Sequence, residues 1–242
     1  MLERDFNTGY VYIQDPLFTG NKRRVYEICD EIMRRGLKIR WGCDARVDDM
    51  KPELVQAMDA ANCYELSLGV ESAVQRHLDA VEKRTSPEKV RRAVQTIREN
   101  SDILVEGLFI LGFPGETWDE AMQTIHFATS LKLDMAQFSI MNPYPGSPLF
   151  EQLAADGVLD TGVREDGTVD TAIWKRYSSY IMFTDIDPIW VTPSLTVEQL
   201  RKLQKIALRS FYLRPRQIYR ALKRLRKENF VESVRIAISG FF

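Results

Sequence analysis

The chain has 242 residues, of which 45% are hydrophobic and 28% are charged, a balance typical of a globular protein with one sizeable core. No run approaches the roughly 18 apolar residues of a membrane helix, and the first ten residues lack the apolar core of a signal peptide. We therefore expect a cytoplasmic protein. The net charge of −1 hides an asymmetry, because residues 201–242 carry twelve Lys/Arg against two Asp/Glu and the remainder is acidic.

Short β-rich segments alternate with helical patterns along the first 141 residues. This alternation predicts βα units and a parallel sheet. Five strands are too few to close an eightfold barrel, so an open or partial barrel and a doubly wound sheet both remain. The predicted strands cover residues 10–14, 38–42, 64–70, 103–111 and 135–141, and the first helices cover residues 22–35 and 52–61.

Four helix starts carry capping signals. A hydroxyl residue precedes a proline at Ser86 and again at Ser147, and proline at the first helical position loses no hydrogen bond. Thr117 with Glu120, and Thr196 with Gln199, have the spacing of capping boxes.

Polar and glycine residues follow each predicted strand. Ligands bind at the carboxyl ends of parallel strands, so these residues predict a polar small-molecule site. They are Asp15, Asp44, Arg46, Glu71, Ser72, residues 112–116, Asn142 and Tyr144.

The three cysteines, Cys29, Cys43 and Cys63, are separated by 14 and 20 residues. No pair has the spacing of a zinc or iron–sulfur site, which favours small buried hydrophobic residues. His77 and His126 lie in helical patterns, and we interpret both as surface or half-buried residues without a chemical role.

Five motifs in fixed order resemble the radical S-adenosylmethionine (SAM) superfamily, in particular its cobalamin-associated branch. The motifs are QDPLFTGN, WGCDARVD, LSLGVESAVQ, GLFILGFPGET and NPYPGSPLF, and the resemblance covers residues from about 10 to 160. It implies an α/β fold, a partial TIM-like (β/α)6 barrel in which the predicted strands are the second to sixth. We expect this barrel over residues 1–160, without its first βα unit, and a helical, basic region over residues 161–242.

The same resemblance implies cofactors and chemistry. Family members cleave SAM with an electron from a 4Fe-4S cluster, producing a 5′-deoxyadenosyl radical. The cluster ligands lie in a CxxxCxxC loop after the first strand, which this sequence lacks. We expect that loop, and a cobalamin domain, in coding sequence upstream. Methyl transfer or carbon-skeleton or ring chemistry on a small-molecule, lipid-like or pigment-like substrate would follow.

Two alternatives stay open. A non-catalytic remnant could retain SAM binding without a cluster. A metal-independent barrel enzyme would need an acid–base pair drawn from Asp15, Asp44 and Glu71.

By resemblance, the site residues have the following roles. Glu71, with Ser72 beside it, contacts the SAM ribose, and Lys83 contacts the SAM carboxylate. Gly112, Phe113 and Pro114 form a turn near adenine, Tyr144 closes the adenine pocket or faces substrate, and Asp15 lies near the methionyl end. Arg46 pairs either with Asp15 or with a carboxylate ligand.

The segment after residue 160 divides into a polar loop and two helices. Residues 162–170 read as the loop, and residues 196–212 as an amphipathic helix. Pro215 interrupts that pattern before a basic helix over residues 216–227. By resemblance, these helices pack beside the barrel or contact substrate. Their charge also fits an anionic partner, which is a nucleic acid, an acidic domain or anionic lipid, and lipid would place the protein at a membrane periphery. We find no specific nucleic-acid motif.

Overall fold

The structure is a computed structural model, and it describes residues 8–164, 166–174, 176–177 and 187–225. The chain divides into two compact units. The first unit comprises residues 1–109 and 126–137, and the second comprises residues 110–125 and 138–242. From the sequence we expected a boundary at residue 160, between the barrel and a helical C-terminal region. The two units are a different kind of division and do not test it, so this boundary stays a prediction.

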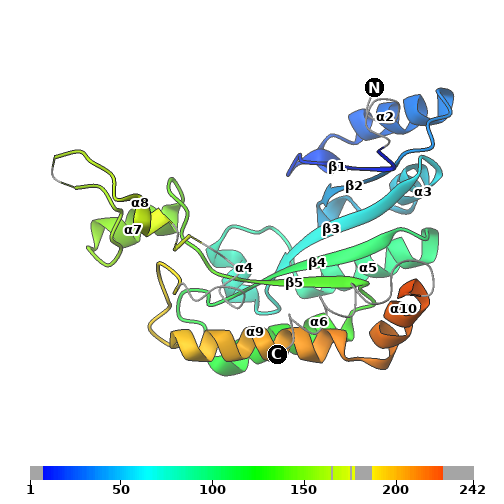
Figure 1. Cartoon of the computed structure of the whole chain (residues 1–242). Coiled ribbons are helices and arrows are strands. Elements are labelled where there is room, and N and C mark those ends of the chain that lie inside the picture. Colours follow the sequence, from blue (N-terminus) through cyan, green and yellow to red (C-terminus); the bar gives the residue numbers. More distant parts are fainter. Residues whose placement is uncertain (1–7, 165, 175, 178–186, 226–242) are drawn as a thin grey trace. The chain divides into compact units, whose positions relative to one another are not determined.

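Five strands form one sheet in the order β1-β2-β3-β4-β5, and the register of the first four shows parallel pairing (Figure 1). All five predicted strands are present, which confirms the mixed α/β class. The second strand was predicted at residues 38–42 but lies at Arg40–Ala45. Its parallel pairing with the following strand continues through Ala45, past the predicted end at residue 42. The strands are β1 (Tyr10–Ile13), β2 (Arg40–Ala45), β3 (Cys63–Glu71), β4 (Leu104–Leu111) and β5 (Met135–Ile140).

The first unit packs helices against one face of its strands. Alternate strand residues such as Cys43, Leu66, Leu68 and Val105 are fully buried, as expected where one face of a sheet is covered. Helix residues including Val25, Leu54, Met58, Val94 and Ile97 complete this core. The helices are α2 (Lys22–Arg34), α3 (Pro52–Ala60), α4 (Gln75–Ala80) and α5 (Pro87–Asn100), with short 3-10 turns η1 (Phe18–Gly20) and η2 (Val47–Asp49).

A buried ion pair fixes the C-terminal end of α5. Arg98 donates to Asp134, whose carboxylate also accepts the Val105 backbone N–H at 2.8 Å. Arg98 donates further to the carbonyls of Lys132 at 2.8 Å and Ile103 at 3.2 Å. One side chain therefore ties α5 to the start of β4 and to the segment before β5.

The second unit has an apolar cluster of its own. Phe113 is 1% exposed and packs with residues from the segments after β5 and around α8. The other buried members are Met141, Phe150, Leu159, Ile173, Ile189 and Trp190. The helices that begin or lie in this unit are α6 (Trp118–Ser130), α7 (Pro148–Ala155), α8 (Thr171–Trp174), α9 (Val197–Tyr212) and α10 (Pro215–Leu225).

All four predicted helix caps are confirmed. Ser86 and Ser147 accept backbone N–H groups three residues later, from Lys89 at 3.3 Å and Phe150 at 3.2 Å. Thr196 and Gln199 form a complete capping box at the start of α9. Thr117 and Glu120 exchange the same two bonds at the start of α6.

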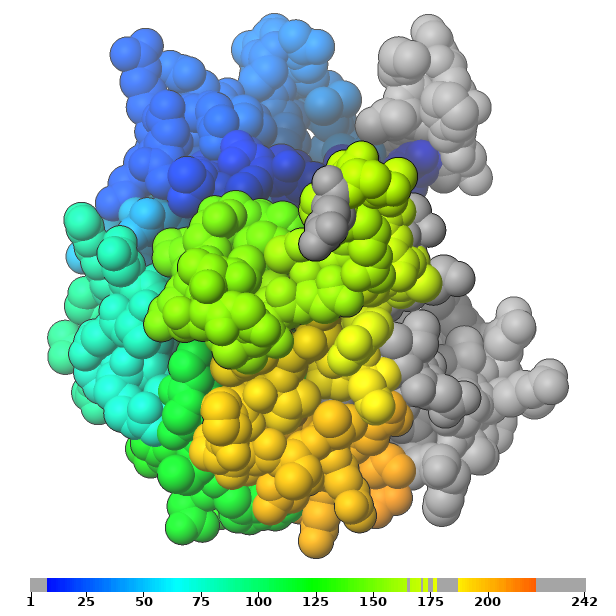
Figure 2. All heavy atoms as spheres, turned by 90° about the vertical axis from the view of Figure 1, so that its left-hand side faces the viewer, coloured from blue at the N-terminus to red at the C-terminus, as the bar shows by residue number. Residues whose placement is uncertain are grey.

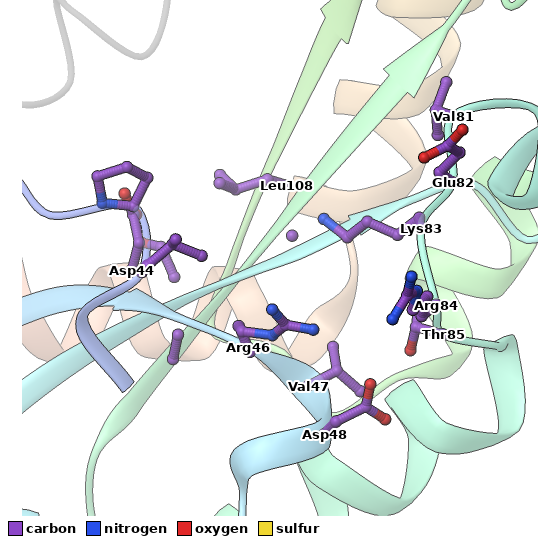
Figure 3. A pocket seen from close by; sticks show the side chains of 15 residues that line it. Asp44, Arg46, Val47, Asp48, Val81, Glu82, Lys83, Arg84, Thr85 and Leu108 are labelled. Carbon is purple, nitrogen blue, oxygen red and sulfur yellow. The ribbon is translucent and has the colours of Figure 1, made fainter. Parts of the chain in front are cut away.

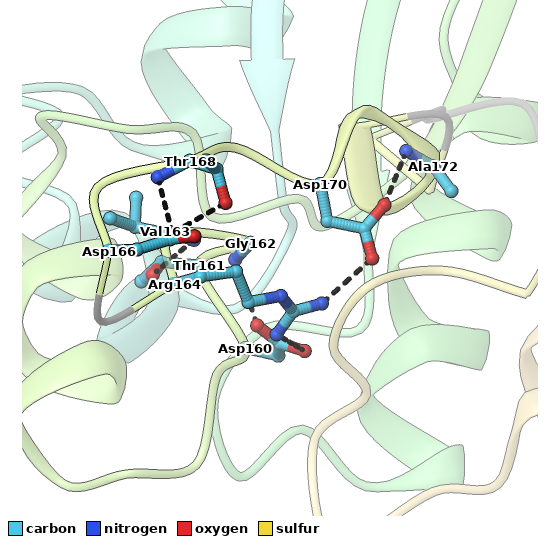
Figure 4. A network of polar contacts seen from close by, with 9 residues as sticks. All are labelled: Asp160, Thr161, Gly162, Val163, Arg164, Asp166, Thr168, Asp170 and Ala172. Carbon is cyan, nitrogen blue, oxygen red and sulfur yellow. Dashed lines mark hydrogen bonds and ion pairs between the residues drawn. The ribbon is translucent and has the colours of Figure 1, made fainter.

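The described residues of the polar segment 162–170, which exclude residue 165, form a loop with a network of polar contacts (Figure 4). Val163 and Val169 form an antiparallel bridge, and Arg164 forms ion pairs with Asp160 at 3.5 Å and Asp170 at 2.7 Å. Asp166 accepts bonds from the backbone and hydroxyl of Thr168. The loop thus holds its shape through its own side chains.

The two C-terminal helices are confirmed, with a break between Tyr212 and Pro215. α9 buries Leu200, Leu203, Ala207 and Phe211 along one face, as the sequence pattern predicted. The last two residues of the predicted second helix, 226 and 227, lie outside the described residues. Among the described residues, no helix combines the length and apolar character needed to cross a membrane.

Candidate functional site

A cavity of about 540 Å³ lies in the first unit, at the carboxyl ends of its strands (Figure 3). Its volume is within the range of about 300–1,000 Å³ that small-molecule sites occupy. Loops after β1 and β2 and the segment between α4 and α5 contribute most of its wall. The lining residues are Pro16, Leu17, Asp44, Ala45, Arg46, Val47, Asp48, Ser67, Gly69, residues 81–85 and Leu108.

Gly69 forms a point of close approach in the cavity floor. A Cβ atom built on Gly69 would lie 2.6 Å from Lys83 Nζ and 2.8 Å from Glu71 Oε1. Lys83 Nζ donates to Glu71 Oε1, and this ion pair is largely shielded, with side chains 35% and 17% exposed. Only glycine leaves room for both charged groups at this position.

The backbone at Glu71 is strained. Its φ of +63° lies in the left-handed region, where a residue with a Cβ is uncommon. The register with β4 shifts between Gly69 and Glu71, which is the mark of a β-bulge. The bulge turns the Glu71 carboxylate toward Lys83, and strain of this kind concentrates at functional sites.

Arg46 is a cation of the cavity wall that is available to a ligand, as is the exposed Arg84. Its guanidinium makes no ion pair or hydrogen bond with any residue that the structure describes, and its backbone N–H donates to Thr19 Oγ1 at 3.0 Å. Figure 3 shows the Arg46 and Lys83 side chains reaching into the same space. By contrast, Asp48 is paired with Lys89 at 3.1 Å. The two cations suit an anionic group such as a carboxylate.

Hydrogen-bonded polar residues lie in and next to the cavity wall, on the strand face opposite the helices. Tyr12 donates to Asp44 at 2.6 Å, and Ser67 donates to Glu106 at 2.8 Å. Burial, reinforced by the bond to Asp44, raises the pKa of Tyr12. These groups are held by one another and are therefore preorganised to contact a bound molecule.

Sequence reasoning missed Tyr12, Ser67, Gly69 and Glu106 because it considered only the strand ends. A signal was present in the alternation of polar and apolar residues within β3 and β4. In the stretch ELSLG, Glu65, Ser67 and Gly69 share one strand face while leucines occupy the other. Polar residues facing away from the helices indicate a second, non-core surface.

Comparison with known proteins identifies this architecture. Residues 3–128, just over half of the chain, match the radical SAM superfamily. The chain belongs to the radical SAM superfamily. Its solved structural relatives include TsrM from Kitasatospora setae, a radical SAM methyltransferase with cobalamin and a 4Fe-4S cluster bound, with a TM-score of 0.62 and 18% identity. That match covers 83% of this chain and 44% of TsrM, and it confirms the predicted partial TIM-like radical SAM fold.

The relatives by sequence include a methyltransferase and a cyclase. An uncharacterized methyltransferase of Pyrococcus horikoshii is 35% identical over 216 residues, which are 89% of this chain and 43% of that protein. The anaerobic magnesium-protoporphyrin IX monomethyl ester cyclase of Cereibacter sphaeroides is 34% identical over 156 residues, which are 63% of this chain and 25% of the cyclase. The chain therefore spans less than half the length of either relative. These similarities support an enzyme of the radical SAM superfamily.

Among the residues assigned by resemblance to the superfamily, Asp15 has a partner from its own βα unit. It forms an ion pair with Arg24 at 2.6 Å and accepts the Leu17 backbone N–H at 3.0 Å. The bond from Leu17, and then Arg24, lowers the pKa of Asp15. Of the two pairings left open for Arg46, the one with Asp15 is not formed, because Arg24 occupies that carboxylate, and pairing with a carboxylate ligand stays a prediction. The role of Asp15 near SAM stays a prediction.

Ser72 lies beside Glu71 but is fully buried. Its hydroxyl accepts the Val74 N–H at 3.1 Å and lies 3.3 Å from His77 Nδ1. His77 is 1% exposed, so its interpretation as a surface or half-buried residue was wrong. His126 is exposed, as predicted. Ser72 and His77 fix the turn from β3 into α4, and neither lines the cavity.

The glycine-rich turn after β4 belongs to the second unit and makes local contacts there. Gly112, at φ +88°, donates its N–H to the buried Glu116 carboxylate, and a Cβ on Gly112 would lie 3.2 Å from Leu200 of α9. Phe113 is buried in the apolar cluster, whereas Pro114 is exposed. Gly115 donates to Thr192 at 2.8 Å. Packing explains these contacts, and adenine binding by the turn stays a prediction.

Tyr144 is 53% exposed in the second unit and stacks on Tyr177, with ring centroids 6.1 Å apart and planes at 25°. A planar ligand could extend such a stack, since aromatic faces prefer offset parallel packing. Its assigned role beside adenine or substrate is likewise a prediction.

The cysteines that the structure describes do not fit an iron–sulfur cluster. Cys29, Cys43 and Cys63 are at most 5% exposed, on the strand and helix surfaces that form the core. Burial raises the pKa of Cys29 to about 11 and raises those of Cys43 and Cys63 as well. Thiolates are the cluster ligands, so these thiols are unsuited to it. No group of three metal-binding side chains exists among the described residues.

Proposed function

We propose that this chain forms the SAM-binding part of a radical SAM enzyme, with SAM bound in the 540 Å³ cavity of the first unit. The observation that carries the proposal is the arrangement around Gly69. The ammonium of Lys83 and the carboxylate of Glu71 meet there, both within 3 Å of where a Cβ on residue 69 would lie, and Arg46 lines the same cavity. SAM presents complementary groups: a carboxylate, an ammonium, a sulfonium and two ribose hydroxyls.

Each charged residue would have a distinct task. Arg46 and Lys83 would bind the SAM carboxylate, because guanidinium and ammonium groups donate charge-assisted hydrogen bonds. Glu71, now paired with Lys83, would accept bonds from the ribose hydroxyls. When SAM binds, Lys83 would give up part of its interaction with Glu71 and donate to the SAM carboxylate. Neither Lys83 nor Glu71 would then be buried without a polar partner.

The hydrogen-bonded polar residues in and next to the cavity wall would orient the reacting partner. Asp44 and Glu106 are carboxylates whose positions are fixed by Tyr12 and Ser67. A carboxylate that is already held in place positions a substrate more effectively than a mobile one. The entropy cost of ordering its side chain was met when the chain folded. These residues would hold substrate next to the adenosyl group and exclude water from it.

The cluster chemistry would be supplied from outside the described residues. A bound 4Fe-4S cluster provides the electron for reductive cleavage of SAM. We place its ligands in a segment N-terminal to the described residues, with cobalamin as a further cofactor for methyl transfer. The five sequence motifs, the methyltransferase and cyclase relatives, and the shared fold with TsrM support this assignment.

Equilibrium dialysis with radiolabelled SAM tests the binding proposal. We expect the 242-residue chain to bind one SAM, and Arg46→Met or Lys83→Met to weaken binding about 10- to 100-fold, the value of a charge-assisted hydrogen bond. Lys51→Met is the matched control, because this exposed ammonium forms no ion pair among the described residues. Absence of binding, or equal affinity in all three variants, would refute the proposal.

A second candidate is a SAM-binding module without radical chemistry. The absence of cluster ligands among the described residues favours it for this chain by itself. Anaerobic incubation with iron and sulfide separates the two. An absorbance band of the cluster at about 400 nm, together with SAM cleavage, would exclude the second candidate. SAM binding without the absorbance band and without cleavage would support it.

A further inference from the structure

α9, drawn in yellow to orange in Figure 2, has one side that faces solvent, and this side is basic. Lys202, Lys205 and Arg209 are exposed and recur at helical spacing, opposite the buried residues Leu200 and Phe211. Lys202 also lies over the Trp118 ring, with its ammonium 5.6 Å from the ring centroid. The helix therefore presents one apolar face to its own unit and one cationic face to solvent.

Exposed apolar side chains follow this basic face along the chain. Leu213 is 56% exposed, Ile218 is 43% exposed and Tyr219 is 68% exposed, at the junction of α9 with α10 and in the first turn of α10. Arg216 is exposed between them. We call Lys202, Lys205, Arg209, Leu213, Arg216, Ile218 and Tyr219 the basic–apolar surface.

The sequence around this surface is uniformly cationic. Residues 201–225 contain nine Lys/Arg and no Asp/Glu, although the whole chain has a net charge of −1. Such a segment is attracted to a polyanion. A bilayer with anionic headgroups uses both halves of the surface, because basic side chains reach the headgroups while apolar side chains enter the interface. The phosphates of a nucleic acid would engage only the cations.

We propose that the basic–apolar surface docks the second unit on an anionic lipid bilayer. The charges attract the headgroups, and Leu213, Ile218 and Tyr219 insert at the level of the acyl boundary. Tyrosine suits this depth, because its ring is apolar and its hydroxyl can remain hydrated. This peripheral association goes beyond SAM binding and does not depend on it.

Vesicle flotation with the full 242-residue chain tests the docking surface. We expect binding to vesicles of phosphatidylglycerol and phosphatidylcholine, little binding to phosphatidylcholine alone, and release at high salt. Each cation near such a surface contributes a factor of about five, so Lys205→Glu with Arg209→Glu should weaken binding at least about 25-fold. Leu213→Ser with Ile218→Ser should weaken it independently of salt.

Matched controls come from the first unit. Lys38→Glu with Lys51→Glu makes the same change in net charge on exposed residues, and Met33→Ser with Leu37→Ser removes exposed apolar groups. Both controls should bind vesicles like the unaltered chain. Circular dichroism confirms that each variant is folded.

The proposal fails if the chain ignores phosphatidylglycerol vesicles, binds neutral ones equally, or responds to the control changes as strongly. It also fails if a single-stranded RNA of mixed sequence binds through the same cations while the vesicles do not. SAM affinity measured on the same variants should be unchanged, so failure of docking and failure of SAM binding are distinguishable.

Discussion

Lys83 and Glu71 form an ion pair directly over Gly69, although Lys83 comes from the loop after α4 and Glu71 from the end of β3. The pair holds two opposite charges beside Gly69 without requiring a ligand, and of the two only Lys83 lines the cavity. Its geometry depends on the β-bulge at Glu71 and on the absence of a side chain at residue 69. The site is thus organised in advance for a ligand that carries both signs of charge.

Gly69→Ala should weaken SAM binding at least about tenfold at little cost to folding. The added methyl would lie 2.6 Å from Lys83 Nζ, so the flexible lysine must leave its place over the floor. Gly9→Ala is the control, because nothing lies within 4 Å of a Cβ there. Isothermal titration with SAM should show at least tenfold weaker binding only for Gly69→Ala. Equal affinities would show that the space above Gly69 is not used.

All three thiols should resist labelling in the folded chain. Burial raises the pKa of Cys29 to about 11 and raises those of Cys43 and Cys63, so the reactive thiolates are scarce near pH 8. Titration with Ellman's reagent should detect no thiol before denaturation and three afterwards. Rapid labelling of any cysteine in native conditions would contradict the assignment of all three to the core.

Tyr10 should give the chain an alkaline dependence of stability. Burial, and then the nearby Glu65 carboxylate, raise the pKa of Tyr10 from 10.0 to about 12. The folded state therefore keeps this proton where the unfolded state has lost it. The contribution to stability is complete below pH 10 and is lost as the pH rises through about 12.

Urea unfolding of the unaltered chain and of Tyr10→Phe measures this effect. The difference in unfolding free energy between the two proteins should shrink between pH 9 and pH 11, at intervals of about half a unit. Tyr26→Phe, on an exposed residue of α2, is the control. A difference that stays constant with pH would mean that Tyr10 titrates normally.

The buried Arg98–Asp134 pair should be a major determinant of stability in the first unit. Asp134→Asn would leave the guanidinium, only 15% exposed, without its counter-charge, at a cost of about 3–5 kcal/mol. The exposed pair of Arg23 and Glu27 offers the comparison, and Glu27→Gln should cost less than about 0.5 kcal/mol. Chemical denaturation measures both. Similar losses would argue against a special role for the buried pair.

Local patterns in the sequence predicted the elements well where one physical rule governed them. The hydroxyl caps at Ser86 and Ser147 are correct because such a cap depends only on residues three positions away. The end of β2 was misplaced because parallel pairing with β3, which lies about 20 residues later, extends the strand. His77 was misjudged because its burial depends on the turn that Ser72 makes.

The sequence by itself determined the order of strands and helices, the five motifs of the superfamily and the cationic C-terminal segment. The resemblance to the superfamily also singled out Arg46, Glu71 and Lys83 as candidate site residues. Arg46 and Glu71 lie within two of the motifs, and such motifs can be recognised without coordinates. Only the tertiary structure decided that Asp15 pairs with Arg24 and that Gly69 lines the cavity. It also decided that Tyr12 donates to the Asp44 carboxylate and that Ser67 donates to the Glu106 carboxylate. These relations join residues from different strands and loops, and the distances between them are set by strand register and helix packing.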